Sequence, residues 1–140
     1  MPLTPSVIVH VDGGARGNPG PAGVGAVVSD LKGNEIGRAN DFIGEATNNV
    51  AEYRAVLLGA ERAAALGATE VEVVNDSELV ARQLTGQYKV KNEGLRPLHR
   101  QTLEALGAFE RWSIKSVPRT DNELADRLVN EAIDARGSTT

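Results

Sequence analysis

Four acidic residues stand where carboxylates can do chemistry. Asp12 ends a nearly continuous apolar run, and a carboxylate there is costly unless it is paired or bound to a metal ion. Asp76 follows a second apolar run, Glu52 lies near the start of a long helical pattern, and Asp126 lies near the start of the last one. Hard divalent ions such as Mg²⁺ take several oxygen ligands, and two-metal sites gather carboxylates around both ions. Four acids from four segments therefore suit a site for two divalent ions.

Three of these acids also have an ordinary structural interpretation. Glu52 is placed to form a capping box with Asn49, Asp76 to cap the next helix, and Asp126 to be a solvated helix residue. For these three, taken singly, the sequence leaves both interpretations open. For Asp12 the functional interpretation is favoured.

A glycine-rich stretch follows Asp12, with six glycines in the thirteen positions from Gly13 to Gly25. It predicts a loop that needs permissive backbone or a close approach to another group. The nucleotide-binding fingerprints fail, because Gly20-Pro21-Ala22 replaces the Gly-Lys-Ser/Thr of a Walker motif and no Gly-x-Gly-x-x-Gly leads into a helix. A plain hairpin connection is the alternative for this stretch.

Length and composition limit the class of protein. The chain has 140 residues, which predicts one domain over 1–136 followed by a disordered tail at 137–140. It has no cysteine, and it has no apolar run near the ~18 residues of a membrane span. A cytoplasmic protein without a membrane partner is expected. The net charge of −4 counts against a strongly basic nucleic-acid binder without excluding nucleic acid.

The elements that must position the acids follow from hydrophobic periodicity. Strands are expected at 6–12, 25–29, 35–43, 70–75 and 114–117, and helices at 48–66, 77–84, 95–106 and from a capping box at 120–123 onward. This order predicts an α/β fold with a mixed five-stranded sheet, three strands antiparallel and two parallel, and helices on both faces. Ligands of such sheets bind at the carboxyl ends of strands, where Asp12, Asp76 and Asp126 fall.

The long helix carries apolar residues that predict its buried face. They are Val50, Tyr53, Leu57, Ala60 and Ala64.

Four ordered motifs then make the chain resemble the type 1 ribonuclease H family. They cover nearly the whole chain, and each supplies one acid on the expected element. The matching residues are Val11-Asp12-Gly13-Gly14 with Gly17 to Gly23, Thr47-Asn48-Asn49 with Glu52, Asn75-Asp76-Ser77, and Asn122 with Ala125-Asp126.

The resemblance implies an endonuclease that cuts the RNA strand of an RNA/DNA hybrid with Mg²⁺ or Mn²⁺. The products would carry 5′-phosphate and 3′-hydroxyl ends. By analogy, Asp12 would bridge two ions and Asp126 would complete the ion on the nucleophile side. Glu52 and Asp76 would hold the ion on the leaving-group side, so that all four acids are metal ligands and catalytic residues.

The resemblance also implies a set of substrate-binding residues. The 2′-hydroxyl, both donor and acceptor, distinguishes RNA from DNA, and amides can satisfy both of its roles. Turn and cap chemistry is the ordinary alternative for the asparagines. The set comprises Gly13, Gly14, Asn18, Asn48 and Asn49 for the RNA strand, and Thr47 with Asn92 for a DNA-strand phosphate.

The chain departs from the family pattern at three places. Glu45 stands where family members often have an arginine, so weaker phosphate binding is expected. The stretch from Gln83 to Arg100 is compact and lacks the usual basic helix and loop, which indicates the compact form of the family. Arg119 stands near the usual place of a mobile histidine, and we interpret it as the catalytic substitute, with a solvated loop cation as the alternative. His10 is expected in the core or beside the site.

Two rivals of the hydrolase hypothesis remain at this stage. One is a non-catalytic module that binds hybrid or double-stranded RNA on the same fold, although a pure binder gains nothing from clustered negative charge. The other is a transposase-like or junction-cutting nuclease, against which Asn18 and residues 47–49 favour RNA. A monomer is expected. The sequence leaves open both the metal preference and cleavage of double-stranded RNA.

Overall fold

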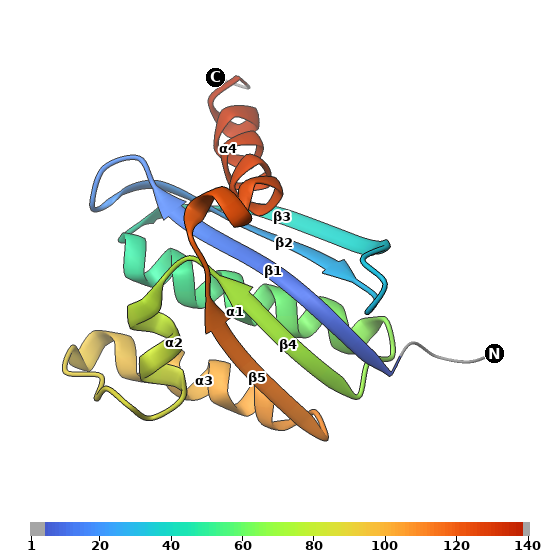
Figure 1. Ribbon diagram of the computed structural model, residues 1–140. Helices are drawn as coiled ribbons and strands as arrows, with labels where there is room; N and C mark the ends of the chain where they lie inside the picture. The colour runs from blue at the N-terminus through green and yellow to red at the C-terminus, as the bar shows by residue number, and fades with distance from the viewer. Residues whose placement is uncertain (1–4, 139–140) are drawn as a thin grey trace.

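The computed structural model describes residues 5–138 of the chain, and the backbone alone at 137–138. One five-stranded sheet runs through the molecule (Figure 1). Its strands are β1 (Ser6–Ala15), β2 (Gly20–Ser29), β3 (Glu35–Ala46), β4 (Glu70–Asn75) and β5 (Arg111–Ser116). The strand order is β3-β2-β1-β4-β5. The β1–β2 and β2–β3 pairs are antiparallel, whereas β1–β4 and β4–β5 are parallel. The predicted mixed sheet is therefore confirmed.

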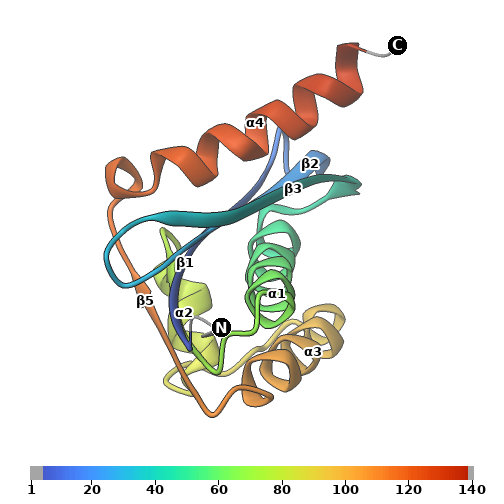
Figure 2. The ribbon, with the colours of Figure 1, turned by 90° about the vertical axis from the view of Figure 1, so that its right-hand side faces the viewer.

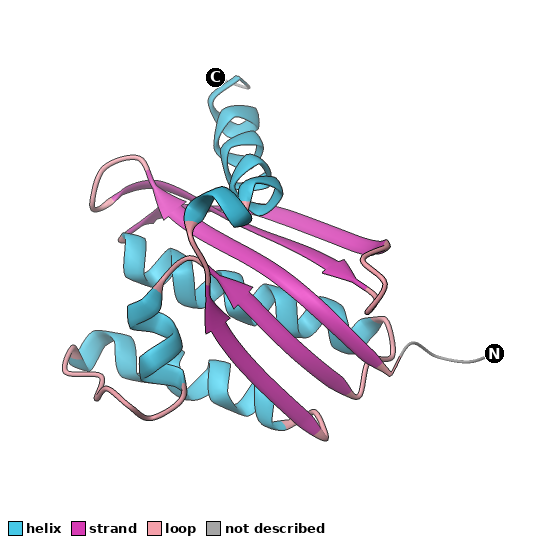
Figure 3. Ribbon diagram, viewed as in Figure 1, coloured by secondary structure: helices cyan, strands magenta, loops and turns pink. Residues whose placement is uncertain are grey.

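Helices cover both faces of this sheet, as the sequence predicts (Figures 2 and 3). Helices α1, α2 and α3 lie on one face, and α4 crosses the other over β1, β2 and β3. Their bounds are α1 Asn48–Ala65, α2 Glu78–Leu84, α3 Arg96–Gly107 and α4 Glu123–Ser138, with short 3₁₀ turns η1 at Glu93–Leu95 and η2 at Arg119–Asp121. Among residues 5–138, no helix combines the length and apolar character needed to cross a bilayer.

Helix α1 turns a face of small residues toward the sheet. Ala51, Ala55, Gly59 and Ala63 are buried, whereas Ala64, which we predict as part of the buried face, is exposed. The small side chains let the helix lie close to β1. A Cβ at Gly59 would come within 2.6 Å of a methyl group of Val11.

The glycine-rich stretch forms two strands rather than a long loop. Strand β1 continues to Ala15 and β2 begins at Gly20, so that only residues 16–19 connect them. Three of the glycines, Gly13, Gly23 and Gly25, are required by close contacts with helices on both faces. A Cβ at Gly13 would collide with the carbonyl group of Ala51 in α1, and one at Gly25 would lie 2.8 Å from the carbonyl oxygen of Ala125 in α4. The absence of these side chains lets both helices reach the centre of the sheet.

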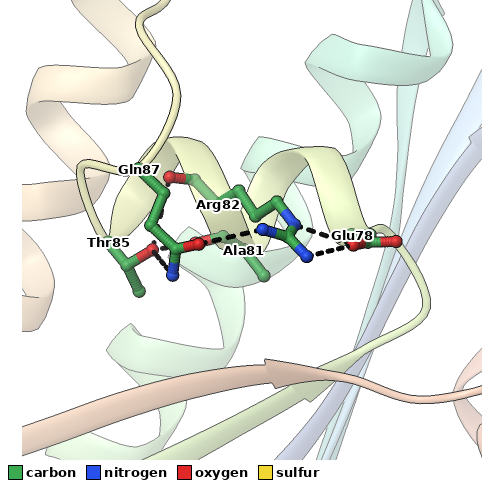
Figure 4. Close-up of polar contacts among 5 residues, drawn as sticks. All are labelled: Glu78, Ala81, Arg82, Thr85 and Gln87. Atoms are coloured by element: carbon green, nitrogen blue, oxygen red, sulfur yellow. Dashed lines mark hydrogen bonds and ion pairs between the residues drawn. The ribbon is translucent and has the colours of Figure 1, made fainter.

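The link between β4 and β5 is compact, as expected from its sequence. Figure 4 shows how the side chains of α2 and the following turn bind each other. The Arg82 guanidinium donates to Glu78 at 2.7 Å and to Gln87 at 3.0 Å, while the Thr85 hydroxyl donates to the carbonyl oxygen of Ala81 at 2.9 Å. The ring of Tyr88 lies 5.4 Å from the same guanidinium. Arg82 therefore stabilises its own helix and turn.

Both ends of α4 differ from the expected ones. The capping box predicted at 120–123 does not start the helix, because residues 119–121 form a 3₁₀ turn and α4 begins at Glu123. The helix continues to Ser138, so residues 137–138 of the predicted disordered tail are helical, and 139–140 lie outside the described residues.

The close approach of β2 and α4 generates a stability prediction. Gly25→Ala should lower the free energy of unfolding by about 1–3 kcal/mol, because the new methyl group meets backbone of α4 that cannot move aside. Gly14→Ala is the matched control on the neighbouring strand, since a Cβ there meets nothing within 4 Å. Urea unfolding of both variants measures the difference. Equal stabilities would contradict this account of the glycines.

Candidate active site

The four acids come together in one cleft at the carboxyl ends of the central strands. Asp12 lies on β1, Asp76 follows β4, Glu52 lies in the second turn of α1, and Asp126 lies in the first turn of α4. All four line the same cleft. Parallel pairing of β1 with β4 places Asp12 and Asp76 at one edge of the sheet. The two helices bring the other two acids to that edge from opposite faces.

Asp12 is the most strongly perturbed of the four. Burial, repulsion by Asp76, and a hydrogen bond that protonated Asp12 donates to Asp126 raise its pKa to about 8. Repulsion by Asp126 acts in the same direction, and the backbone N–H of Gly13 opposes it. Each cause that raises the pKa disfavours a charged Asp12 among its neighbours. A divalent cation between these carboxylates would remove the repulsion.

Glu52 belongs to the same electrostatic group. Burial raises its pKa to about 7, with repulsion by Asp76 in the same direction, although a hydrogen bond from Ser77 and attraction by Arg119 lower it. The capping-box interpretation of Glu52 is wrong, because the N-cap of α1 is Thr47, whose hydroxyl accepts from the N–H of Val50 at 3.2 Å. The carboxylate of Glu52 is therefore free to face the cleft.

Asp76 does not cap the helix that follows it. The N-cap of α2 is Ser77, whose hydroxyl oxygen accepts from the N–H of Val80 at 3.2 Å. The carboxylate of Asp76 lies 3.7 Å from Nε of Arg119. The Asp76 side chain is 12% exposed, whereas the Arg119 side chain is 81% exposed. The structure thus brings Arg119 to the cleft, beside an acid of the cluster.

The residues present fit divalent cations by their chemistry. Carboxylate oxygens are the ligands that Mg²⁺ and Mn²⁺ take, and the cleft offers them from four chain segments. Within residues 5–138, no three acidic or histidine side chains form a ready-made ligand set. The acids nevertheless interact, since Asp76 repels both Asp12 and Glu52, and Asp126 shares a hydrogen bond with protonated Asp12. Bound cations would complete such a site.

Asn122 fixes the position of α4 relative to the strand that carries Asp12. Its buried side-chain amide donates to the carbonyl oxygen of Val11 at 2.8 Å. The backbone N–H of Asp126 donates to the carbonyl oxygen of Asn122 at 3.2 Å. Asn122 thus connects Val11, the residue before Asp12, to the first turn of α4, which carries Asp126. The family motif contained Asn122, but its spacing alone did not indicate this function.

A second hollow lies beside the cleft and gathers predicted substrate-binding residues. It is lined by Asn18, Thr47, Asn49 and Asn92, together with Val50, Gly94 and Leu95. The Asn92 side chain accepts from the N–H of Gly94 at 2.9 Å. Thr47 and Asn92, far apart in the sequence, therefore meet at one surface.

Asn48 joins this hollow to the acidic cleft. Its side chain accepts from the N–H of Ala15 at 2.9 Å, and its own N–H donates to the Asn18 side chain at 3.0 Å. These bonds hold the β1–β2 turn against the start of α1. Asn48 lines the acidic cleft together with Gly13 and Gly14, so these residues of the predicted set lie next to the acids. The turn chemistry of the asparagines and a binding role are compatible here.

Other residues of the cleft were not predicted from the sequence. Arg16, Val129, Asn130 and Ile133 also line it. The position of Arg16 inside the glycine-rich stretch was the one available signal. His10 lines a separate hollow with Asn122, and burial and the charge of Lys115 lower its pKa. It is not among the residues that line the acidic cleft.

Comparisons with known proteins agree with this geometry. The model of the reverse transcriptase-like family matches residues 10–132. The chain is similar to RNase H1 of the halophilic archaeon Halobacterium salinarum, with 45% identity and a TM-score of 0.91 over 93% of this chain and 98% of that one. The chain belongs to the type 1 ribonuclease H family. A further family member, LC11-RNase H1 in complex with an RNA/DNA hybrid, is 44% identical with a TM-score of 0.88 over 93% of this chain and 98% of that one.

Some relatives in the family are longer than this chain. A bifunctional protein of Mycobacterium tuberculosis is 47% identical over 130 residues, which are 92% of this chain and 36% of the relative. The match to a ribonuclease HI sequence of Halobacterium salinarum covers 64% of that relative. The region shared with these relatives is the ribonuclease H-like domain.

The crowding of acids generates a stability prediction with a defined pH dependence. A raised folded-state pKa means that deprotonation disfavours folding. The penalty therefore begins as pH rises through the unfolded pKa, near 4, and is complete above the folded values of about 7 for Glu52 and about 8 for Asp12. Without metal, the free energy of unfolding should fall across this window.

Asp76→Asn should reduce this penalty, because Asp76 repels both Asp12 and Glu52. In EDTA at pH 8 we expect the variant to be more stable than the wild type by about 1–2 kcal/mol, with the difference vanishing near pH 4. Melting curves across this range measure it. Asp41→Asn, an exposed acid on β3, controls for net charge. A variant that melts at or below the wild type at pH 8 would show that the acids are not crowded.

Proposed function

We propose that the chain hydrolyses the RNA strand of RNA/DNA hybrids with divalent cations, leaving 5′-phosphate and 3′-hydroxyl ends. The observation that carries the proposal is the gathering of Asp12, Glu52, Asp76 and Asp126 in one cleft, with raised pKa values at Asp12 and Glu52. The family of the chain and the RNA/DNA hybrid bound to its relative LC11-RNase H1 support the substrate. A monomeric enzyme is part of this proposal.

We infer two ions per site, and the distribution of the acids over four segments supports this. Asp12 would bridge both ions, since it interacts with Asp76 and with Asp126. Asp126 would complete the ion on the nucleophile side, and Glu52 with Asp76 would hold the other. Bound Mg²⁺ or Mn²⁺ would supply a water of lowered pKa and would neutralise charge on the departing 3′ oxygen.

The chain itself orients these groups. Ser77 donates a hydrogen bond to Glu52, and Asn122 connects β1 to α4. Arg119, near Asp76, would stabilise negative charge that develops on the phosphate as the bond breaks. Rigid strands and helix starts hold the acids, so little reorganisation is needed when the substrate arrives.

Substrate choice would come from the second hollow and the β1–β2 turn. Asn18, Asn48 and Asn49 would read 2′-hydroxyls in the minor groove, where Gly13 and Gly14 let the backbone approach. Thr47 and Asn92 would hold a phosphate of the DNA strand. Their common surface supports this arrangement, since one hollow adjoins the acidic cleft.

A non-catalytic binding module is the weaker hypothesis. Clustered carboxylates repel phosphate, and a pure binder gains nothing from them. One gel assay with labelled hybrid, double-stranded RNA and double-stranded DNA, each with Mg²⁺, Mn²⁺ or EDTA, tests the function. Metal-dependent cleavage of the hybrid alone, or of hybrid and double-stranded RNA, supports it. Binding without cleavage in every metal would contradict it.

Removal of single metal ligands should abolish cleavage without abolishing binding. Asp12→Asn, Glu52→Gln and Asp76→Asn each remove an anionic ligand and leave the asparagine contacts of the hollow in place. We expect losses in turnover of at least about 1,000-fold, with hybrid affinity retained in anisotropy titrations. Turnover by Asp12→Asn near the wild-type rate would contradict the two-ion mechanism.

Arg119→Ala should lower kcat more than it weakens hybrid binding. The guanidinium lies near the acids rather than in the hollow, so it acts on charge that grows toward the transition state. A decrease of about 10- to 100-fold in kcat with a small change in KM is expected. Arg127→Ala, an exposed arginine of α4, is the control. An unchanged kcat would make Arg119 a solvated loop cation.

A further inference from the structure

Arg16 lies at the edge of the acidic cleft without belonging to the acid cluster. It is the first residue of the turn between β1 and β2, and its side chain lines the cleft that holds the acids. Of the described residues lining this cleft, Arg16 and Arg119 are the two cations. Arg119 pairs with Asp76, whereas the partners of Arg16 stand on α4, outside the proposed metal ligands.

Two side chains of α4 hold the Arg16 guanidinium in place. One terminal nitrogen lies 2.7 Å from the carboxylate of Asp134, and the other donates to Oδ1 of Asn130 at 3.1 Å. The amide of Asn130 in turn donates to the carbonyl oxygen of Asp126 at 3.1 Å. A guanidinium has five N–H donors in a planar fork, so it can bind a further anion while the contact with Asn130 holds its plane.

The partners of Arg16 form a row that leads away from the proposed metal site. Asp126, Asn130 and Asp134 are spaced four residues apart on one face of α4. Four residues advance a helix by about 6 Å, which is comparable to the distance between successive phosphates of a nucleic-acid strand. Arg16 contacts both Asn130 and Asp134, so it lies about one to two phosphate spacings along α4 from Asp126.

The ion pair with Asp134 does not explain Arg16 by itself. Both side chains are well exposed, at 47% and 67%, and exposed pairs contribute only about 0–1 kcal/mol. Phosphate oxygens match the guanidinium fork and can displace an exposed carboxylate from it. The chain carries a net charge of −4 and lacks a basic handle, so each cation at the cleft matters for binding a polyanion.

We propose that Arg16 binds a backbone phosphate of the cleaved strand one or two positions from the scissile one, with Asn130 orienting the guanidinium and Asp134 as the anion that the phosphate displaces. This proposal rests on the proposed hydrolysis of hybrids and adds a contact on the α4 side of the cleft. Arg16 is thus a substrate-binding residue that positions the strand, and it leaves the chemistry to the acids.

The test combines Arg16→Ala with hybrids that lack the negative charge of one phosphate. Each hybrid has an RNA segment that can be cut at one position only. In a series of such hybrids, a neutral methylphosphonate replaces one phosphate of the cleaved strand at a time, on either side of the cut. On the unmodified hybrid, Arg16→Ala should lower kcat/KM about 5- to 10-fold, chiefly through KM, and reduce the slope of log affinity against log salt by about 1. One methylphosphonate hybrid should lack the phosphate that Arg16 contacts. On that hybrid, Arg16→Ala should lower kcat/KM by less than about 2-fold, because the contact is already lost in the wild type.

Two variants distinguish a phosphate contact of Arg16 from a purely structural role, in which Arg16 acts as a latch that holds the β1–β2 turn against α4. Asp134→Asn removes the competing anion, so it should bind hybrid as tightly as the wild type or more tightly, whereas a latch predicts the same loss as Arg16→Ala. Arg38→Ala removes an arginine of similar exposure, paired with Glu35 at the other end of the sheet, and should change nothing. A loss at Asp134→Asn equal to that at Arg16→Ala would overturn the proposal.

Two further results would also overturn it, namely an Arg16→Ala enzyme with unchanged KM and salt slope, or one with the same loss on every methylphosphonate hybrid. The hydrolysis itself is judged separately from wild-type cleavage of the unmodified hybrid. If the wild type cuts nothing, the same comparison of variants and substrates is made by anisotropy in Mg²⁺. The phosphate contact is then still accepted or rejected on its own.

Discussion

Repulsion among the four carboxylates is the constraint on which the rest of this structure depends. Asp12 and Glu52 carry raised pKa values because their neighbours are acids and water is partly excluded. Such a cluster must be held by rigid elements. In this chain they are the central strand β1, the parallel strand β4 and the starts of α1 and α4. A bound cation would relieve the electrostatic repulsion among the carboxylates. The arrangement that lowers the stability of the metal-free fold therefore favours metal binding.

Close packing of backbone is how the fold supplies that rigidity. Gly13 and Gly59 bring α1 against β1, and Gly25 brings α4 against β2. Because both helices lie close to the sheet, Glu52 and Asp126 reach Asp12 from opposite faces. Asn122 completes the connection through the carbonyl oxygen of Val11. A side chain at any of these glycines would push a helix, and with it an acid, away from the cleft.

The sequence predicted the sheet, its mixed pairing and the four acids, because alternating apolar runs and motif order are local signals. It misplaced the glycine-rich stretch, since glycine has no strand preference of its own and its burial here depends on helices more than thirty residues away in the chain. The buried face of α1 was partly wrong for a related reason. Tyr53 and Ala60 of the predicted face are buried, but Ala64 is exposed, and close packing also buries Ala51, Ala55 and Gly59.

Contacts between segments distant in the chain explain what the sequence could not show. Thr47 and Asn92 meet in one hollow only because η1 folds back toward the start of α1. Arg16 reaches Asn130 and Asp134 across more than a hundred residues, and no periodicity within either segment indicates the pairing. In a chain with a net negative charge, the proposed hydrolysis of hybrids would require cations placed by such contacts to offset the acids along the phosphate backbone. Arg119 pairs with an acid of the cluster, whereas Arg16 pairs with two side chains of α4. Under the proposed hydrolysis, the first would serve the reacting phosphate and the second a nearby one.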